Sequence, residues 1–314
     1  MKKTIIVLFT ALLLVGIAGC KNTVESGGGG GSGGGGGSGG GGSNTSTPYT
    51  KVNTQTIGET TYDIVTFGSF PQSEKASTVS ITSESKTVGS FTYYKGDDNE
   101  WYAELNSKYY KVEPIKWRVL TTDYNGNGKK LLLAENILIN KAYHASLNNN
   151  YENSSIRAYL TGDFLTTAFT QAEQDAIATT TVVNNAASTN PDGNDKLWNN
   201  GDNQYASDTP TSDKIFLLSE QEVTKADYGF AAYNEYMGDG THDDSTRIRI
   251  TTAFAKDSGA YQNDTEGYGG YWWLRSPHCD VCDVARRVYH DGHAISNYPV
   301  NDDSTGVVPA LCLN

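Results

Sequence analysis

Two cysteines and two histidines near the end of the chain have a spacing that metal sites use. Cys279 and Cys282 are separated by two residues, and His290 and His293 follow with the same separation. Thiolate and imidazole are ligands with which zinc forms tetrahedral sites, and this order of ligands could close one. The gap between the two pairs is shorter than in common zinc fingers. A zinc-stabilised segment is therefore one alternative.

The same two cysteines allow two other kinds of chemistry. A reactive Cys279 or Cys282 would need an activating partner within hydrogen-bond reach, which sequence alone does not show. A disulfide between them is compatible with an exported protein, although the short spacing would strain it. A catalytic protein that uses these cysteines is thus a second alternative.

Acidic pairs and one further cysteine are less informative. Asp243-Asp244 and Asp302-Asp303 offer carboxylates for hydrolysis, but nothing marks one of them as a general acid. Cys312 lies among apolar residues, which predicts a buried thiol. We assign no metal, no cofactor and no catalytic residue from these patterns.

The composition of the C-terminal segment is unusual. From His278 to Asn314 there is no Lys, Glu, Gln, Met or Trp. Every residue type that is present has a codon ending in a pyrimidine, whereas the five missing types have none. The simplest interpretation is an irregular loop with an ordinary bias towards polar residues. The sharper one is a segment whose residues were drawn by a codon-restricted randomising process.

The elements that would hold this segment are mostly strands. Alternation and β-branched or aromatic content predict strands at Ile57–Phe67, Phe91–Lys95, Glu100–Glu104, Lys108–Val112, Lys129–Ala134 and Lys214–Leu218. A further strand is predicted to begin after Pro114, with its apolar face formed by Ile115, Trp117 and Val119 and its polar face by Lys116 and Arg118.

Helices are predicted to be few. Apolar spacing indicates one from Ile156 to Leu165, capped by Asn153 or Ser154. Capping boxes begin two more, Thr170 with Glu173 and Ser219 with Glu222, the second running towards Tyr228. Two long polar loops are expected, at Asn184–Asp213 and Gly238–Asp244.

The N-terminal region predicts export and anchoring. Lys2 and Lys3 precede a short apolar run, and Ile17-Ala18-Gly19-Cys20 resembles the bacterial lipobox. Residues 1–19 would be a lipoprotein signal peptide, Cys20 the lipidation site and residues 20–48 a flexible Gly/Ser-rich tether. The net charge of −12 argues against a nucleic-acid partner. We expect one domain over residues 49–314.

Short motifs over most of this domain resemble those of a bacterial family with the C-type lectin fold. In chain order they are Phe67-Gly68-Ser69-Phe70-Pro71-Gln72, Pro114-Ile115-Lys116-Trp117-Arg118-Val119-Leu120, Ser155-Ile156-Arg157-Ala158-Tyr159-Leu160, Ala168-Phe169 leading into Glu173, Phe216-Leu217-Leu218-Ser219 with Glu222, Trp273-Leu274-Arg275-Ser276-Pro277 and Gly306-Val307-Val308-Pro309-Ala310-Leu311. The arginine that this family usually has before the last proline is Val308 here.

The tail narrows the resemblance to the variable proteins of Treponema diversity-generating retroelements, which are lipoproteins with a C-terminal variable region. The resemblance implies an α+β, C-type lectin fold of the formylglycine-generating-enzyme type, with mostly short strands, long loops and a few helices. It further implies a retroelement-diversified receptor surface at about residues 273–314, displayed on the cell surface for an unknown protein or surface-molecule ligand, and no catalysis.

The resemblance also divides the tail into two sets of residues. The fixed frame is expected at Trp273, Arg275, Ala285, Val288, Gly292, Val300 and Gly306. Gly292 follows Asp291, a strong turn pair that allows a positive φ. The displayed, ligand-binding positions are expected at His278, Asp280, Val281, Asp283, Arg286, Tyr289, His290, His293, Ile295, Asn297, Tyr298, Asn301 and Asp302.

Overall fold

The computed structural model describes residues 49–189, 205–231, 244–278, 281–294 and 296–314. The chain divides into two units, Met1–Gly42 and Ser43–Asn314, and every described residue belongs to the second. The predicted signal peptide, the lipidation site Cys20 and the tether lie outside the described residues. Within the described ranges, no helix is both long and apolar enough to cross a membrane.

The largest sheet is antiparallel and contains most of the N-terminal half of the domain. Its main path runs β12-β18-β7-β6-β5-β4-β3, while β2 pairs with β6 and β1 pairs with β2. The meander expected at residues 91–112 is confirmed. The strands are β1 (Thr50–Ile57), β2 (Thr60–Glu74), β3 (Ile81–Val88), β4 (Phe91–Gly96), β5 (Trp101–Leu105), β6 (Lys108–Thr121), β7 (Lys130–Ala134), β12 (Ile215–Phe216) and β18 (Ala310–Leu313).

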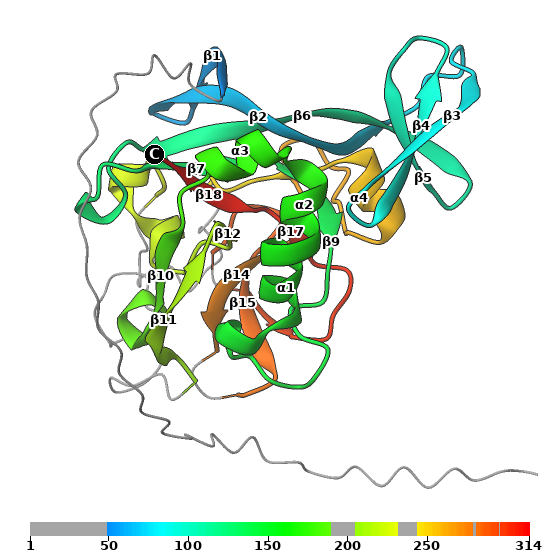
Figure 1. The fold of residues 1–314 in the computed structure, drawn as a ribbon. Helices are drawn as coiled ribbons and strands as arrows, with labels where there is room; N and C mark the ends of the chain where they lie inside the picture. The colour runs from blue at the N-terminus through cyan, green and yellow to red at the C-terminus, as the bar shows by residue number, and fades with distance from the viewer. Residues whose placement is uncertain (1–48, 190–204, 232–243, 279–280, 295) are drawn as a thin grey trace, which may run out of the picture. The chain divides into compact units, whose positions relative to one another are not determined.

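Two of these strands are longer than the sequence predicts. Figure 1 shows β2 and β6 side by side, and each continues where an end was expected, at Gly68 and at Pro114. The register shifts between Thr66 and Ser69, and Gly68 has a φ of +67°. This bulge lies beside Pro114, which pairs with Ser69, so both strands continue past residues that usually end a strand.

A second sheet contains four strands from the C-terminal tail. Its order is β16-β15-β14-β17-β9. The strands are β9 (Ile139–Asn140), β14 (Trp272–Pro277), β15 (Val284–Val288), β16 (Ser296–Pro299) and β17 (Gly306–Val307). Two small sheets pair β10 (Thr180–Asn184) with β11 (Ser207–Asp213) and β8 (Asn136–Ile137) with β13 (Ile250–Thr251).

The helices are short, and the expected caps begin two of them. Ser154 accepts a hydrogen bond from the Arg157 amide, and Thr170 forms both bonds of its capping box with Glu173. The α-helices are α1 (Ser155–Tyr159), α2 (Leu165–Ala168), α3 (Gln171–Ala176) and α4 (Ala253–Ser258), with a π turn at Leu160–Phe164. The 3₁₀ turns are Tyr124–Gly126, Tyr151–Asn153, Ala186–Thr189, Glu222–Thr224 and Ala226–Tyr228.

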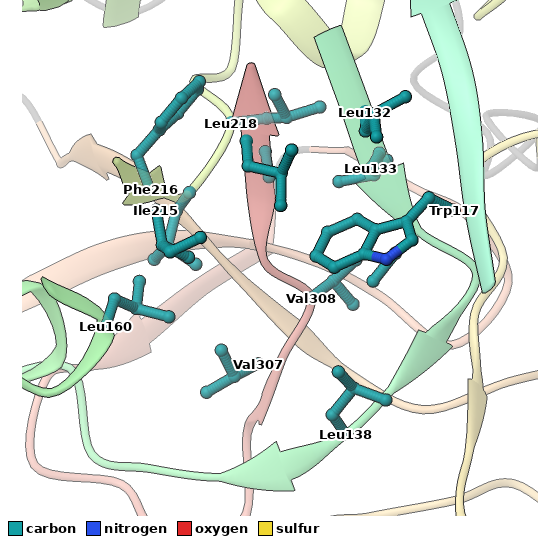
Figure 2. Close-up of a cluster of buried hydrophobic side chains, with 14 of the residues drawn as sticks. Trp117, Leu132, Leu133, Leu138, Leu160, Ile215, Phe216, Leu218, Val307 and Val308 are labelled. Atoms are coloured by element: carbon teal, nitrogen blue, oxygen red, sulfur yellow. The ribbon is translucent and has the colours of Figure 1, made fainter. Parts of the chain in front are cut away.

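The core lies where the two larger sheets meet the helices. Figure 2 shows Trp117, Leu132 and Leu133 of the first sheet around the same interior as Val307 and Val308, which lead into β18. All of these side chains are fully buried. A continuous apolar run such as that of β7 is typical of a strand covered on both faces. The fold is thus α+β and rich in strands.

Four local predictions are wrong. The strand expected at Ile57–Phe67 is broken by a turn at Gly58 and Glu59, so that Ile57 ends β1 and Thr60 begins β2. Ser207–Asp213 is not loop but strand β11, since its backbone pairs with β10, and Pro210 is tolerated because this sheet has only two strands. Arg118 is not on a polar face but buried, where Glu135 forms a salt bridge with it at 2.6 Å. The box at Ser219 begins only two 3₁₀ turns, because the carboxylate of Glu222 also binds Arg275.

Candidate functional site

The tail crosses the domain as a buried frame. The expected frame residues Trp273, Arg275, Ala285, Val288, Val300, Gly292 and Gly306 are all buried. Trp272 pairs with Val288 and Trp273 pairs with Arg287, so β14 supports β15 from inside the sheet. The exposed parts of the tail are therefore held by residues that belong to the core.

A buried ion pair fixes the start of this frame. Arg275 donates to Glu222 at 2.5 Å and to the carbonyl oxygens of Val183 and Leu217. Glu222 also accepts from the Tyr124 hydroxyl at 2.6 Å and from the Ser219 amide at 2.8 Å. Burial alone would raise the pKa of Glu222, but the charge and hydrogen bond of Arg275 and the bond from Tyr124 lower the pKa overall.

A residue outside the tail anchors its first loop. The buried Asn149 side chain donates through Nδ2 to the carbonyl oxygens of Val281 and Val284 at 2.8 Å, and to that of His278 at 3.3 Å. These contacts reach only main-chain atoms of the tail. The loop is therefore held in place whatever side chains it carries.

A tight turn joins β15 to the segment before β16. The Gly292 amide donates to the carbonyl oxygen of Tyr289 at 3.0 Å, and the Tyr289 amide donates to that of His293 at 2.8 Å. Gly292 has a φ of +89°, as predicted, and a Cβ there would lie 2.1 Å from the carbonyl oxygen of Asp244. Glycine is required here both for the backbone angle and for this close approach.

Most of the expected display positions that the structure describes are at or near the surface. Val281, Asn297 and Asn301 are exposed, whereas the partly exposed ones are His278, Asp283, Tyr289, His290, His293, Tyr298 and Asp302. Asp280 and Ile295 lie outside the described residues. The expectation that Arg286 is displayed at the surface is wrong. Arg286 is only 2% exposed, because its side chain turns inward to the buried Glu220.

Two of these residues, Tyr289 and His290, belong to an aromatic cluster beside the tail sheet. The ring of Tyr271 stacks on that of Tyr261, with centroids 4.3 Å apart, and on that of Tyr289, with centroids 4.6 Å apart. His290 contacts all three rings and also that of Tyr268, at 5.1 Å. We call Tyr261, Tyr268, Tyr271, Tyr289 and His290 the aromatic cluster.

A buried arginine supports the cluster from the sheet. The Arg287 guanidinium lies 4.1 Å from the Tyr271 ring centroid and 3.5 Å from that of Tyr298. It donates to the hydroxyl of Thr305 at 3.0 Å. Cation–π contacts of this kind are stronger when the cation is desolvated. Arg287 thus ties both aromatic side chains to the frame.

The phenol at the centre of the cluster, that of Tyr271, stays protonated at neutral pH. Burial, and then the hydroxyls of Tyr289 and Tyr261, raise the pKa of Tyr271 well above its ordinary value. Rings that carry a neutral hydroxyl offer a large contact area with a polar end. The arrangement is suited to non-covalent recognition.

Part of this cluster was not predicted from the sequence. Tyr261, Tyr268 and Tyr271 precede the segment of unusual composition, and Arg287 was not among the expected display positions. The signal was present, because these three tyrosines lie within a short Gly-rich stretch that leads into Trp272. Only the fold shows that this stretch packs against the 289–293 turn.

Two alternatives, a zinc site and a reactive cysteine, relied on Cys279 and Cys282. Cys282 is disulfide-bonded, which leaves its sulfur neither a thiolate ligand nor a nucleophile. Cys279 lies outside the described residues. Among the residues that the structure describes, no three His, Cys, Asp or Glu side chains are grouped as a metal site would require. Cys312 is buried as predicted, and burial raises the pKa of its thiol to about 12.

The acidic pairs have structural partners. Asp244 is buried, accepts from the amides of Ala231 and Thr246, and pairs with Arg247 at 3.1 Å. Asp302 accepts from the Ser304 hydroxyl at 2.8 Å. Carboxylates bound in this way hold loops in place. Asp243, the other member of the first pair, lies outside the described residues.

Comparison with known proteins gives a family without an assigned activity. The fold and the site together define a class of protein: an α+β domain with an aromatic cluster at the surface beside its last strands. Residues 127–314 match a family model described as a domain of unknown function (DUF6273), and the chain belongs to that family. No curated protein and no solved structure matches the chain significantly.

Proposed function

We propose that this protein is a lipid-anchored receptor on the bacterial cell surface, whose C-terminal segment is diversified by a retroelement to change ligand specificity. The domain would be a C-type lectin fold of the formylglycine-generating-enzyme type, and its function would be non-covalent binding without catalysis. The ligand would be another protein or a surface molecule. The predicted lipobox and the Gly/Ser-rich tether support the anchored location.

The observation that carries this proposal is the separation of frame and surface within one segment. Trp273, Ala285, Val288, Val300 and Gly306 are buried, while Val281, Asn297 and Asn301 between them are exposed. The segment also lacks five residue types, as expected of a codon-restricted process. Its first loop is anchored through main-chain atoms by Asn149, which supports tolerance of changing side chains.

The aromatic cluster gives the proposed surface a physical basis for affinity. Tyrosine is favoured at binding hot spots, because it buries a large area at a small cost in conformational entropy. Tyr261, Tyr268 and Tyr271 come from outside the segment of unusual composition, whereas Tyr289 and His290 come from within it. The proposed surface would thus combine a fixed half with a variable half.

Sequencing this gene in many isolates of the source population tests the proposal. We expect differences to cluster between His278 and Ser304, to lie in pyrimidine-ending codons and to leave Trp273, Val288 and Gly292 unchanged. Tyr261, Tyr268 and Tyr271 should be unchanged as well. An invariant tail, or one in which only Cys279, Cys282, His290 and His293 are retained, would overturn the proposal.

A further inference from the structure

A buried carboxylate beneath the tail sheet has few partners. Glu220 is fully buried, and its amide donates to the Ser276 hydroxyl at 2.9 Å. Its carbonyl oxygen accepts from the Thr224 hydroxyl at 3.1 Å. Within the described ranges, neither oxygen of its carboxylate accepts a hydrogen bond of regular geometry. Buried carboxylates normally have such bonds, because desolvation without them is costly.

The neighbouring Glu222 shows what a fully supported carboxylate looks like in the same place. Glu222 is also buried, but it accepts hydrogen bonds from Tyr124, Ser219 and Arg275. All of those donors belong to the fixed core or to the expected frame. The described residues therefore supply several donors to the Glu222 carboxylate but no hydrogen bond of regular geometry to that of Glu220, two residues earlier.

The charge that faces Glu220 comes from the tail. Arg286 Nε lies 3.2 Å from Glu220 Oε2, and both side chains are buried. Arg286 is on β15 opposite Asn297 of β16, and its guanidinium donates to the Asn297 side-chain oxygen. Arg286 is the one charged group of the described residues that acts on Glu220. It is also a position at which the sequence predicts variation.

We propose that Glu220 is the fixed counter-charge of tail position 286, so that the residue at 286 sets how strongly the domain's stability depends on pH. The electrostatic coupling between Glu220 and Arg286 is argued from the geometry alone. The role of this coupling in a diversified tail rests on the proposed function. An arginine at position 286 neutralises the buried carboxylate. A neutral residue there leaves Glu220 to take up a proton instead.

The titration of Glu220 fits this arrangement. Burial raises the pKa of Glu220 to about 7, although the charge and hydrogen bonding of Arg286 lower it. The folded state therefore holds the proton more tightly than the unfolded state, where the pKa is near 4.5. The stabilisation that comes with protonation is complete below about pH 4.5 and is lost as pH rises through 7. Removing Arg286 raises the pKa further and extends the loss to higher pH.

In the proposed receptor, this coupling would give substitutions at position 286 a different effect from substitutions at the exposed positions of the tail. Exchange of an exposed residue such as Asn301 changes the surface alone. Exchange of Arg286 also changes the charge balance of the core. The scaffold would tolerate a neutral residue there because a protonated carboxyl can remain buried at a lower cost than an ionised one.

Melting temperatures of the full-length protein, measured between pH 5 and pH 9, test the proposal. Between pH 5 and pH 9, we expect the melting temperature of Arg286→Asn to fall by about 5 °C more than that of the wild type. The double variant Glu220→Gln with Arg286→Asn should lose that additional dependence. Asn297→Ser, which removes a neutral partner of Arg286 and leaves both charges, is the matched control and should follow the wild type.

Glu220→Gln alone keeps the test decisive if Arg286→Asn does not fold. This variant should show a smaller fall in melting temperature between pH 5 and pH 7 than the wild type, because the titrating carboxyl is gone. An equal loss for Arg286→Asn at pH 5 and pH 9, or an unchanged pH dependence in Glu220→Gln, would overturn the coupling. An invariant tail among isolates would instead overturn diversification and leave the coupling intact.

Discussion

At the scale of single residues, the domain buries its charges in two different ways. Glu222 is surrounded by donors from fixed positions, so it remains ionised in the core. Among the described residues, the one ionic partner of the Glu220 carboxylate is Arg286. Burial is common to both, and the difference in pKa direction follows from the hydrogen bonds that each carboxylate receives. The two residues should therefore respond to pH in opposite directions.

Glu222→Gln tests the ionised case. Because this change leaves the Arg275 guanidinium buried without its anion, we expect a loss of about 3–5 kcal/mol of unfolding free energy at pH 7. The lowered pKa of Glu222 means that its contribution is present above pH 4.5 and is lost as pH falls below that value. Urea unfolding at pH 7 and pH 3 measures both effects. A loss of equal size at both pH values would contradict the prediction.

Buried charges are also where sequence reasoning was weakest. Arg118 alternates with apolar residues, which predicts a solvent-facing side, and Arg286 was expected among the displayed positions of the tail, yet both side chains are buried. Each arginine meets a carboxylate that is distant in sequence, Glu135 in one case and Glu220 in the other. Period-two patterning carries no information about such partners. The apolar frame residues, by contrast, were predicted correctly, because burial of large apolar groups needs no specific partner.

At the scale of elements, local signals succeeded where the partners lie within one turn. The box at Thr170 and Glu173 begins a helix because both of its hydrogen bonds are local. The same signature at Ser219 and Glu222 begins only two short 3₁₀ turns. There the glutamate forms its local bond and also a long-range one to Arg275. Tertiary contacts thus decide which element an identical sequence signal begins.

The turn after β15 offers a test of the frame. Gly292→Ala would require a positive φ and would place a Cβ 2.1 Å from the Asp244 carbonyl oxygen. We expect a loss of more than about 2 kcal/mol in unfolding free energy. Gly126→Ala is the matched control, since Gly126 has a φ of +71° and no atom within 4 Å of the added Cβ. Chemical denaturation of both variants should show the larger loss at Gly292; similar losses would show that the close approach has no cost.

The exposed and buried positions at the end of β16 offer a second test. Val300 is fully buried and Asn301 is exposed. Val300→Ser should cost about 2 kcal/mol because it removes a buried apolar side chain, whereas Asn301→Ser should change the unfolding free energy by less than about 0.5 kcal/mol. Thermal melting of the two variants gives the comparison. A large loss at Asn301 would mean that the tail surface is not free to vary.

At the scale of the whole molecule, the family match and the folded unit do not coincide. The family model covers residues 127–314, but the largest sheet begins earlier in the chain. β18 pairs with β7, and both strands lie inside the match. β7 pairs in turn with β6, which lies outside it. Trp117 of β6 is fully buried and donates through its indole nitrogen to the Phe67 carbonyl oxygen at 2.7 Å. The core is thus shared across the boundary.

Truncation at that boundary should therefore prevent folding. A fragment of residues 127–314 lacks β6, which leaves the Leu131–Leu133 edge of β7 unpaired and one side of the core uncovered. Residues 49–314 should melt cooperatively by circular dichroism, whereas the shorter fragment should show no cooperative transition. Adding residues 49–126 as a separate chain is the control, because restored melting would show that the missing strands alone are required. Cooperative unfolding of the fragment at the melting temperature of the longer chain would mean that the tail is held without β6.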